Sequence, residues 1–107
     1  MPSFDLGSAA LLGKRRIQCI EFEGHSCLLI FLDGRFYATE QECPHKQASL
    51  CFAQLSGRHL VCPWHEARFD IESGRCSGPL MLHDLKTWPV SEENGRVIIY
   101  FPGEGDE

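Results

Sequence analysis

Residues 43–65 read CPHKQASLCFAQLSGRHLVCPWH. Cysteine and histidine occur here in two close pairs, and sixteen residues separate the pair Cys43 and His45 from the pair Cys62 and His65. Four such side chains can be brought together only if two loops face each other. The proline that follows each cysteine restrains its loop and removes a backbone donor. The spacing therefore predicts one metal site that is built from two loops.

The residue types leave two kinds of metal site open. A tetrahedral zinc ion is one of them, because two cysteines and two histidines are a common zinc ligand set. However, zinc sites usually pair their thiolates about two to four residues apart, whereas each loop here joins one thiolate to one imidazole. That mixed pattern suits a dinuclear cluster, in which one iron takes both cysteines and the other takes both histidines.

The composition around this stretch is that of one small globular domain. The chain has 107 residues, 43% apolar and 23% charged, and is too short for two independent cores. Its net charge of −5 argues against sequence-independent binding to nucleic acid or to an anionic membrane. The longest apolar run, residues 27–32, is far too short to cross a membrane, and the start of the chain does not read as a secretory signal. We therefore expect a cytoplasmic protein.

Strand signals dominate the rest of the chain. Residues 16–22 alternate polar and apolar side chains, and so do residues 67–71. Asp33-Gly34 and Asn94-Gly95 favour the type I′ turn of a β-hairpin. The strands predicted beside these turns are residues 26–32 and 35–39, and residues 86–91 and 96–101. We expect a small antiparallel all-β domain with a short helical turn within residues 50–55 and loose termini.

The spacing C-x-H, sixteen residues, C-x-x-H resembles the signature of Rieske [2Fe–2S] proteins, in which two histidines replace two cysteines on one iron. The resemblance covers about residues 17–101. Residues 43–50 look like the first cluster loop, residues 62–74 like the second, and Ser77-Gly78-Pro79 falls where the family's proline loop covers the cluster. It implies one [2Fe–2S] cluster, with the ligands Cys43, His45, Cys62 and His65.

The resemblance also implies the Rieske fold. An antiparallel β base would be formed by approximately residues 14–41 and 81–101, and a smaller cluster-binding lobe, approximately residues 42–80, would be inserted into it. The lobe would carry the two ligand loops and the proline loop. Residues 1–107 would then be a single domain, with residues 102–107 as an acidic tail.

Departures from the family predict a low redox potential. The high-potential members in cytochrome bc complexes have an extra cysteine in each loop, where this chain has Ala48 and Trp64. Those members also donate hydroxyl hydrogen bonds to the cluster and to a cysteine sulfur from a serine and a tyrosine, where this chain has Ala67 and Phe69. Because fewer hydrogen bonds stabilise the reduced cluster, we expect a potential of about −150 mV and a soluble ferredoxin rather than a respiratory subunit.

Two more departures lie beside the predicted ligands. The family often has glycine after the second histidine ligand, where this chain has Glu66, and the carboxylate close to His65 is expected to lower the potential further. Lys46-Gln47 also lies where a glycine is common, so the first loop is expected to have a different shape. The surface that partners would meet is predicted to be partly apolar and to lie around Pro44, Trp64 and Pro79.

The other four cysteines are Cys19, Cys27, Cys51 and Cys76. Six cysteines in a short chain can also indicate disulfides. However, Cys19 and Cys27 lie in apolar, strand-like runs, and free cysteine is among the most buried residue types. We therefore expect these four cysteines to be reduced and buried.

By resemblance, the protein is a one-electron carrier of a bacterial-type multicomponent oxygenase that acts on aromatic hydrocarbons. A flavin-dependent reductase would load the cluster, and the ferredoxin would pass single electrons to a terminal oxygenase without substrate chemistry of its own. We expect a monomer with no nucleic-acid or membrane partner. Two alternatives stay open: the small Rieske-like subunit of an assimilatory nitrite reductase, and an interaction module stabilised by zinc on two cysteines and two histidines.

Overall fold

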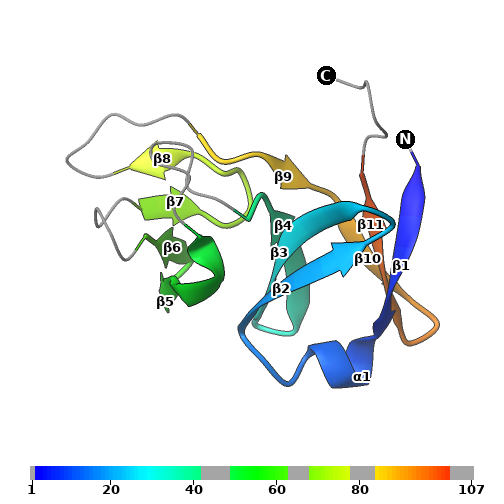
Figure 1. The fold of residues 1–107 in the computed structure, drawn as a ribbon. Coiled ribbons are helices and arrows are strands. Elements are labelled where there is room, and N and C mark those ends of the chain that lie inside the picture. Colours follow the sequence, from blue (N-terminus) through cyan, green and yellow to red (C-terminus); the bar gives the residue numbers. More distant parts are fainter. Residues whose placement is uncertain (1, 42–48, 63–67, 78–83, 102–107) are drawn as a thin grey trace.

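The computed structural model describes residues 2–41, 49–62, 68–77 and 84–101 of the chain. In these residues nearly all of the regular structure is β-strand, arranged in three antiparallel sheets (Figure 1). The helical elements described are α1 (Ala9–Leu12) and the 3₁₀ helix η1 (Leu50–Phe52). None of the described helices is long and apolar enough to span a membrane. The predicted antiparallel all-β class is confirmed.

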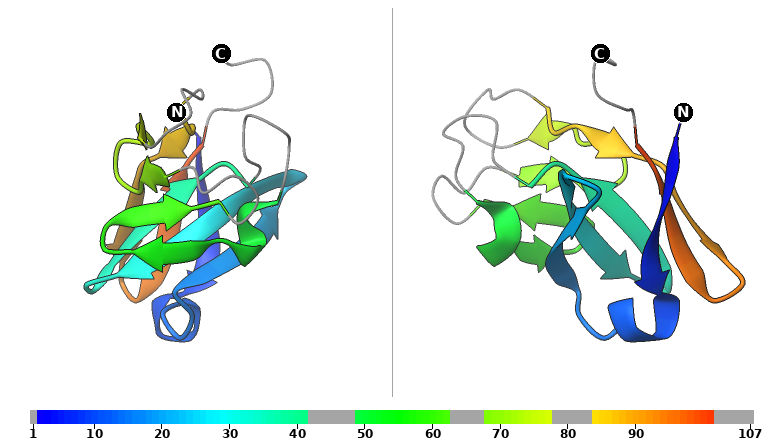
Figure 2. Two further views of the ribbon diagram at one scale, coloured as in Figure 1. Left: turned by 90° about the vertical axis from the view of Figure 1, so that its left-hand side faces the viewer. Right: turned by 45° about the vertical axis from the view of Figure 1, so that its right-hand side comes forward.

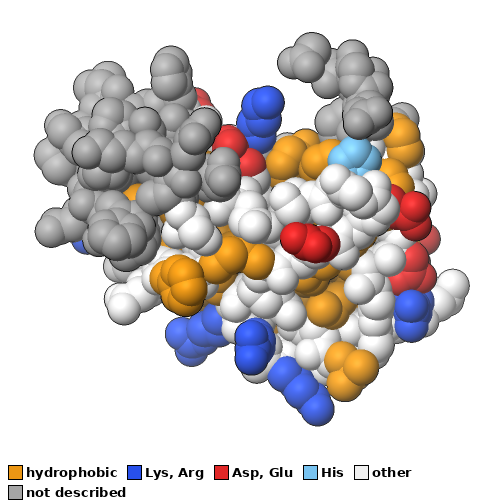
Figure 3. All heavy atoms as spheres, in the orientation of Figure 1, with side chains coloured by type: hydrophobic (Ala, Val, Ile, Leu, Met, Phe, Trp, Pro, Cys, Tyr) orange, Lys and Arg blue, Asp and Glu red, His pale blue; other side chains and the backbone are white. Residues whose placement is uncertain are grey.

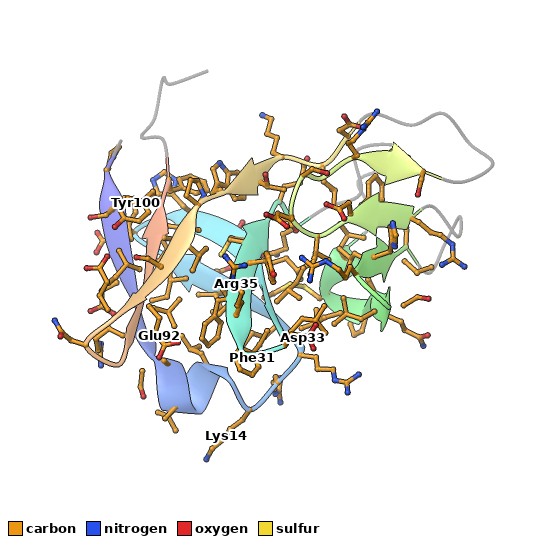
Figure 4. All side chains as sticks on the ribbon, turned by 180° about the vertical axis from the view of Figure 1, so that it is seen from behind. Lys14, Phe31, Asp33, Arg35, Glu92 and Tyr100 are labelled. Carbon is orange, nitrogen blue, oxygen red and sulfur yellow. A yellow bond between two sulfur atoms is a disulfide. The ribbon has the colours of Figure 1, made fainter. Side chains whose placement is uncertain are left out.

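The central sheet contains β2 (Ile17–Phe22), β3 (His25–Leu32), β4 (Arg35–Thr39) and β9 (Thr87–Trp88), in the order β2-β3-β4-β9. Strands β3 and β4 form the hairpin predicted from Asp33-Gly34. These two residues have φ of 53° and 76°, as a type I′ turn requires, and Figure 4 shows Asp33 at the end of the hairpin. Strand β3 is buried on both faces, which explains its continuous apolar run.

A second sheet packs against one face of the central sheet. It contains β1 (Ser3–Ser8), β11 (Arg96–Tyr100) and β10 (Val90–Glu93), in the order β1-β11-β10. The expectation of a loose N-terminus is wrong, because Ser3–Ser8 pairs along β11. The reason is its own alternation: Phe4 and Leu6 share one face of the strand, and both pack against buried core residues such as Ile99 and Val97.

The third sheet lies at the opposite face of the central sheet (Figure 2). It contains β5 (Gln54–Ser56), β6 (His59–Val61), β7 (Arg68–Asp70) and β8 (Cys76–Ser77), in chain order. The helical turn expected within residues 50–55 is shorter than that range, since η1 ends at Phe52 and a strand begins at Gln54. Leu28 and Ile30 of β3 pack with Leu60 and Phe69 of this sheet in one buried cluster. The third sheet is therefore fixed to the rest of the molecule by a shared core.

The expectation that all four remaining cysteines are reduced and buried is wrong for two of them. Cys19 and Cys51 form a disulfide, with their Cα atoms 5.7 Å apart, and Cys19 is exposed. Alternation along β2 explains this, because Cys19 shares a strand face with Ile17, which packs towards the third sheet. Cys27 is a fully buried thiol, as expected, and burial raises the pKa of its thiol to about 12. Cys76 is half-buried on β8.

Candidate metal centre

One of the four predicted ligands lies within the described residues, and three lie outside them. Cys62 is described, whereas the other three, Cys43, His45 and His65, lie outside the described residues. So do the other positions predicted to surround the cluster, which are Pro44, Lys46, Ala48, Trp64, Glu66 and Pro79. Within the described ranges, no three cysteine, histidine, aspartate or glutamate side chains gather as a metal site. The described part of the predicted centre is Cys62, together with the residues that border the predicted loops.

Cys62 directly follows the last residue of β6, and it is fully buried. Its neighbours in the core cluster include Leu50, Leu60 and Phe69, so its surroundings are apolar. The structure places it in no disulfide. A sulfur that is held at the end of a strand in a dry environment fits a soft metal centre such as an iron–sulfur cluster. The assignment of Cys62 as a cluster ligand stays a prediction.

The first predicted loop is bordered by a backbone hydrogen bond. The N–H of Leu50 donates to the carbonyl oxygen of Gln41 at 2.9 Å, across residues 42–49. Ser49 caps the N-terminus of η1, since its Oγ accepts a 3.1 Å hydrogen bond from the N–H of Cys51. Leu50 is fully buried in the same cluster as Cys62. The last residues of the first predicted loop are therefore fixed in the core that contains Cys62.

The second predicted loop and the proline loop leave the third sheet at one end. In the register of that sheet Val61 pairs with Arg68, and Arg68 pairs with Ser77. Val61 and Arg68 border residues 62–67, which begin the second predicted loop, and Ser77 is the first residue of the predicted proline loop. These three bordering residues are neighbours across the sheet, at the end of the molecule seen on the left of Figure 1. The predicted loops thus begin and end on neighbouring strands.

Hydrogen bonds also fix the residues that follow the proline loop. The N–H of Leu85 donates to the carbonyl oxygen of Gly74 at 2.8 Å, and Asp84 Oδ1 accepts a 2.9 Å hydrogen bond from the N–H of Cys76. Gly74 has a φ of 79°, and a Cβ added there would overlap the carbonyl oxygen of Leu85. Only glycine permits this close approach without strain. The turn signal at residues 72–74 was visible in the sequence, but this contact with Leu85 was not.

Two further contacts join the third sheet to the central one. Arg58 donates a 3.1 Å hydrogen bond to the hydroxyl of Tyr37 on β4, and its guanidinium lies 5.6 Å from the centre of that ring. The hydrogen bond to Tyr37 is the main cause that raises the pKa of the Arg58 guanidinium. Arg58 also donates a 3.2 Å hydrogen bond to Glu72. The contact between Arg58 and Tyr37 was not predicted from the sequence, because no local pattern relates these two residues.

Comparison with known proteins decides the family. Residues 4–89 match the Rieske [2Fe-2S] domain. The chain belongs to this family. The match covers most of the chain, from Phe4 of β1 to the residue after β9, and includes all of the elements that border the predicted loops of this Rieske domain. The predicted Rieske fold and the predicted Rieske-type [2Fe–2S] cofactor are therefore confirmed, and a zinc ion is disfavoured.

Curated relatives of this Rieske domain include ferredoxin components of dioxygenase systems. The ferredoxin component of the p-cumate 2,3-dioxygenase system of Pseudomonas putida is 36% identical over 77 residues, which are 71% of this chain and 65% of the relative. The ferredoxin component of the naphthalene 1,2-dioxygenase system of Pseudomonas putida is 36% identical over 80 residues, which are 75% of this chain and 77% of the relative. The first alignment thus spans less than two thirds of its relative.

Solved structures share the fold. The Sphingomonas yanoikuyae B1 ferredoxin superposes with a TM-score of 0.82 and 26% identity, over 94% of this chain and 100% of that one. A chain in the complex of reduced oxygenase and oxidized ferredoxin of carbazole 1,9a-dioxygenase superposes with a TM-score of 0.80 and 24% identity, over 91% of each chain. The arrangement of three sheets is therefore that of known Rieske ferredoxins.

Proposed function

We propose that the protein is a one-electron carrier, the ferredoxin component of a multicomponent oxygenase system. The observation that supports this most directly is the 36% identity to ferredoxin components of the p-cumate and naphthalene dioxygenase systems, within a chain that belongs to the Rieske family. A bound [2Fe–2S] cluster would take up and release one electron at a time. A flavin-dependent reductase would supply that electron, and a terminal oxygenase would receive it. We place this exchange in the cytoplasm, with the carrier as a monomer.

The ligand set of the proposal is Cys43, His45, Cys62 and His65. The two thiolates would hold the iron that stays ferric, and the two imidazoles would hold the iron that becomes ferrous. Cys62 supports this assignment, because a buried sulfur at the end of a strand has the rigidity and dryness that a ligand of this kind needs. The chain's own part is to fix the ligands, to exclude water around the sulfurs and to present the imidazole edges to a partner.

The distribution of charge along the chain predicts how the protein docks on its partners. Residues 42–80 contain four basic side chains (Lys46, Arg58, Arg68 and Arg75) and four acidic ones (Glu42, Glu66, Asp70 and Glu72), so 4 − 4 = 0. The whole net charge of −5 therefore lies outside this lobe. Docking around Pro44, Trp64 and Pro79 would then depend on shape and apolar contact more than on long-range attraction. We expect an association rate with a shallow salt dependence, and a steep fall with rising salt would contradict this docking mode.

Metal analysis tests the cofactor and its ligands. The purified protein should contain about two iron and two labile sulfide per chain, and the reduced protein should show the low average g value of histidine-ligated clusters. Cys62→Ser should lose the cluster. The matched control is Cys27→Ala, which removes another fully buried thiol, on β3, and should keep the cluster. One zinc with no sulfide, or a cluster that survives Cys62→Ser unchanged, would overturn the proposal.

Electron transfer is tested by reconstitution. With NADH and the reductase and oxygenase of a naphthalene dioxygenase system, the loaded protein should support turnover of naphthalene, and the Cys62→Ser protein should not. The reduction of the cluster by the reductase alone, followed in stopped flow, separates the two half-reactions. A loaded protein that neither accepts electrons from any such reductase nor donates them to any such oxygenase would contradict the carrier function. It would not contradict the presence of the cluster.

A further inference from the structure

The Cys19–Cys51 disulfide lies at the surface of the molecule. Cys19 is on β2, which is the terminal strand of the central sheet, and its side chain is exposed. Cys51 is in η1, directly after buried Leu50, and is half-buried. The two residues are 32 positions apart, so the bond connects the central sheet with the start of the third-sheet region. A disulfide at the open edge of a sheet is accessible to a second protein.

A hollow of about 430 Å³ lies beside Cys51. Its lining comprises Arg16, Ile17, Cys51, Ala53, Gln54 and Leu55. Arg16 is exposed and contributes the positive charge of this lining, next to further basic side chains at residues 14 and 15. Lys and Arg side chains gather along the lower edge of the surface in Figure 3, and Figure 4 labels Lys14 on the loop between α1 and β2. Positive charge near a sulfur stabilises the thiolate form that takes part in exchange.

Two of the other described cysteines differ from this pair in access. Cys27 and Cys62 are fully buried, and neither is in a disulfide. A reagent in solution therefore reaches the Cys19–Cys51 bond before it reaches either of them. Leu50 is buried and its N–H is hydrogen-bonded to Gln41, so η1 has two anchors besides the disulfide. Opening is thus compatible with a folded protein.

We propose that Cys19–Cys51 is a thiol–disulfide exchange site whose substrate is a dithiol reductant of the thioredoxin class. A thiolate of the reductant attacks Cys19 Sγ, the bond between the two cysteines breaks, and Cys51 leaves as a thiolate beside the hollow that Arg16 lines. The second thiolate of the reductant then attacks the mixed disulfide and releases Cys19. The chain gains two electrons and two protons as two thiols, and the reductant is oxidised to its disulfide.

The experiment uses the holoprotein, isolated without reductant, and reduced thioredoxin as the probe. Samples are trapped with N-ethylmaleimide, and the peptides that contain Cys19 and Cys51 are followed by mass spectrometry. We expect the cross-linked peptide to be present at the start and to be replaced by two alkylated peptides in native buffer, while the far-ultraviolet circular dichroism stays unchanged. Two free thiols before any reductant is added, or a bond that opens only in denaturant, would overturn the proposal.

Matched variants test the part assigned to Arg16. Arg16→Gln should slow the exchange by about threefold, the size expected when a leaving thiolate loses one nearby charge. Arg15→Gln changes the net charge equally, and Arg15 is also exposed but is not part of the lining, so its rate should match the wild type. Equal rates in the two variants would overturn the role of Arg16. The readout is the state of the two cysteines, so it is independent of cluster content and of electron transfer.

Discussion

The N–H of Leu50 donates a 2.9 Å hydrogen bond to the carbonyl oxygen of Gln41, and so brings together the two ends of residues 42–49. Leu85 and Gly74 form the equivalent bond, at 2.8 Å, across residues 75–84. The two bonds fix the borders of the first predicted loop and of the proline loop, and Leu50 and Leu85 belong to the same buried core cluster. A site for electron transfer benefits from this, because ligands that are held by rigid elements keep their geometry.

Gly74→Ala should destabilise the protein by about 3 kcal/mol. Gly74 has a φ of 79°, and an added Cβ would overlap the backbone of Leu85, which cannot move aside as a flexible side chain can. Urea denaturation measures the loss. The control is Gly57→Ala, where φ is 60° and nothing lies within 4 Å of the added Cβ, so about 1 kcal/mol is expected. Equal losses at the two positions would show that the approach of Leu85 is not restrictive.

Removing the disulfide should destabilise the oxidised protein by about 4 kcal/mol in the double variant Cys19→Ser with Cys51→Ser. This is the chain-entropy value for a loop of this length, since 32 positions separate the two cysteines. The free energy of unfolding is measured by urea denaturation without reductant. Wild-type protein with its disulfide reduced should unfold at the same urea concentration as the double variant. A variant as stable as the oxidised wild type would contradict the bond.

Phe69→Tyr should raise the midpoint potential of the bound cluster by about 40 mV, which for one electron corresponds to about 1 kcal/mol of hydrogen bonding. Phe69 is fully buried on β7, in the same cluster as Cys62. By the resemblance to the family, it stands where the high-potential members have a tyrosine that bonds to a cysteine sulfur. Protein-film voltammetry gives the potential. Phe52→Tyr is the control, because Phe52 is 80% exposed and should leave the potential unchanged.

Glu66→Gly should raise the midpoint potential as well, because it removes a carboxylate that directly follows the predicted ligand His65 in the sequence. Glu66→Gln separates the charge from the backbone, and should give most of the same increase if charge is the cause. Voltammetry of the three proteins at one pH makes the comparison. An unchanged or lower potential in both variants would refute this role of Glu66.

The sequence was sufficient where the signal is local. Asp33-Gly34 and Asn94-Gly95 predicted two hairpins, and all four residues have the positive φ that these turns need. The alternation of Phe4 and Leu6 is also typical of a strand, but a loose terminus was expected there and β1 was not predicted. The two pairs of ligand-type residues with their spacing were enough to predict the family, because that pattern is rare.

Contacts between distant segments could not be predicted in this way. The disulfide depends on which face of β2 carries Cys19 and on where η1 lies, and cysteine connectivity does not follow from sequence alone. The same holds for Arg58 and Tyr37, which are 21 positions apart. Tertiary packing brings these residues together, and neither the periodicity nor the turn signals of the sequence predict such contacts.

The pH dependence of stability should carry a contribution from Asp70. The N–H of Ser73 donates a 2.8 Å hydrogen bond to Asp70 Oδ2, and this is the main cause that holds the pKa of the Asp70 carboxyl below its ordinary value of 3.8. Because the folded-state pKa is the lower one, the contribution is complete above the ordinary value and is lost as pH falls through the folded-state pKa. Asp70→Asn should therefore destabilise the protein by about 1 kcal/mol at neutral pH.

Denaturation curves from about pH 7 down to about pH 2 test this, since the difference between Asp70→Asn and the wild type should shrink as the wild-type carboxyl is protonated. Glu92→Gln removes an exposed carboxylate on β10, far along the chain from this turn, and serves as the control (Figure 4). A difference between Asp70→Asn and the wild type that stays constant over the whole range would mean that the shape of the side chain, and not its charge, stabilises the turn at residues 70–73.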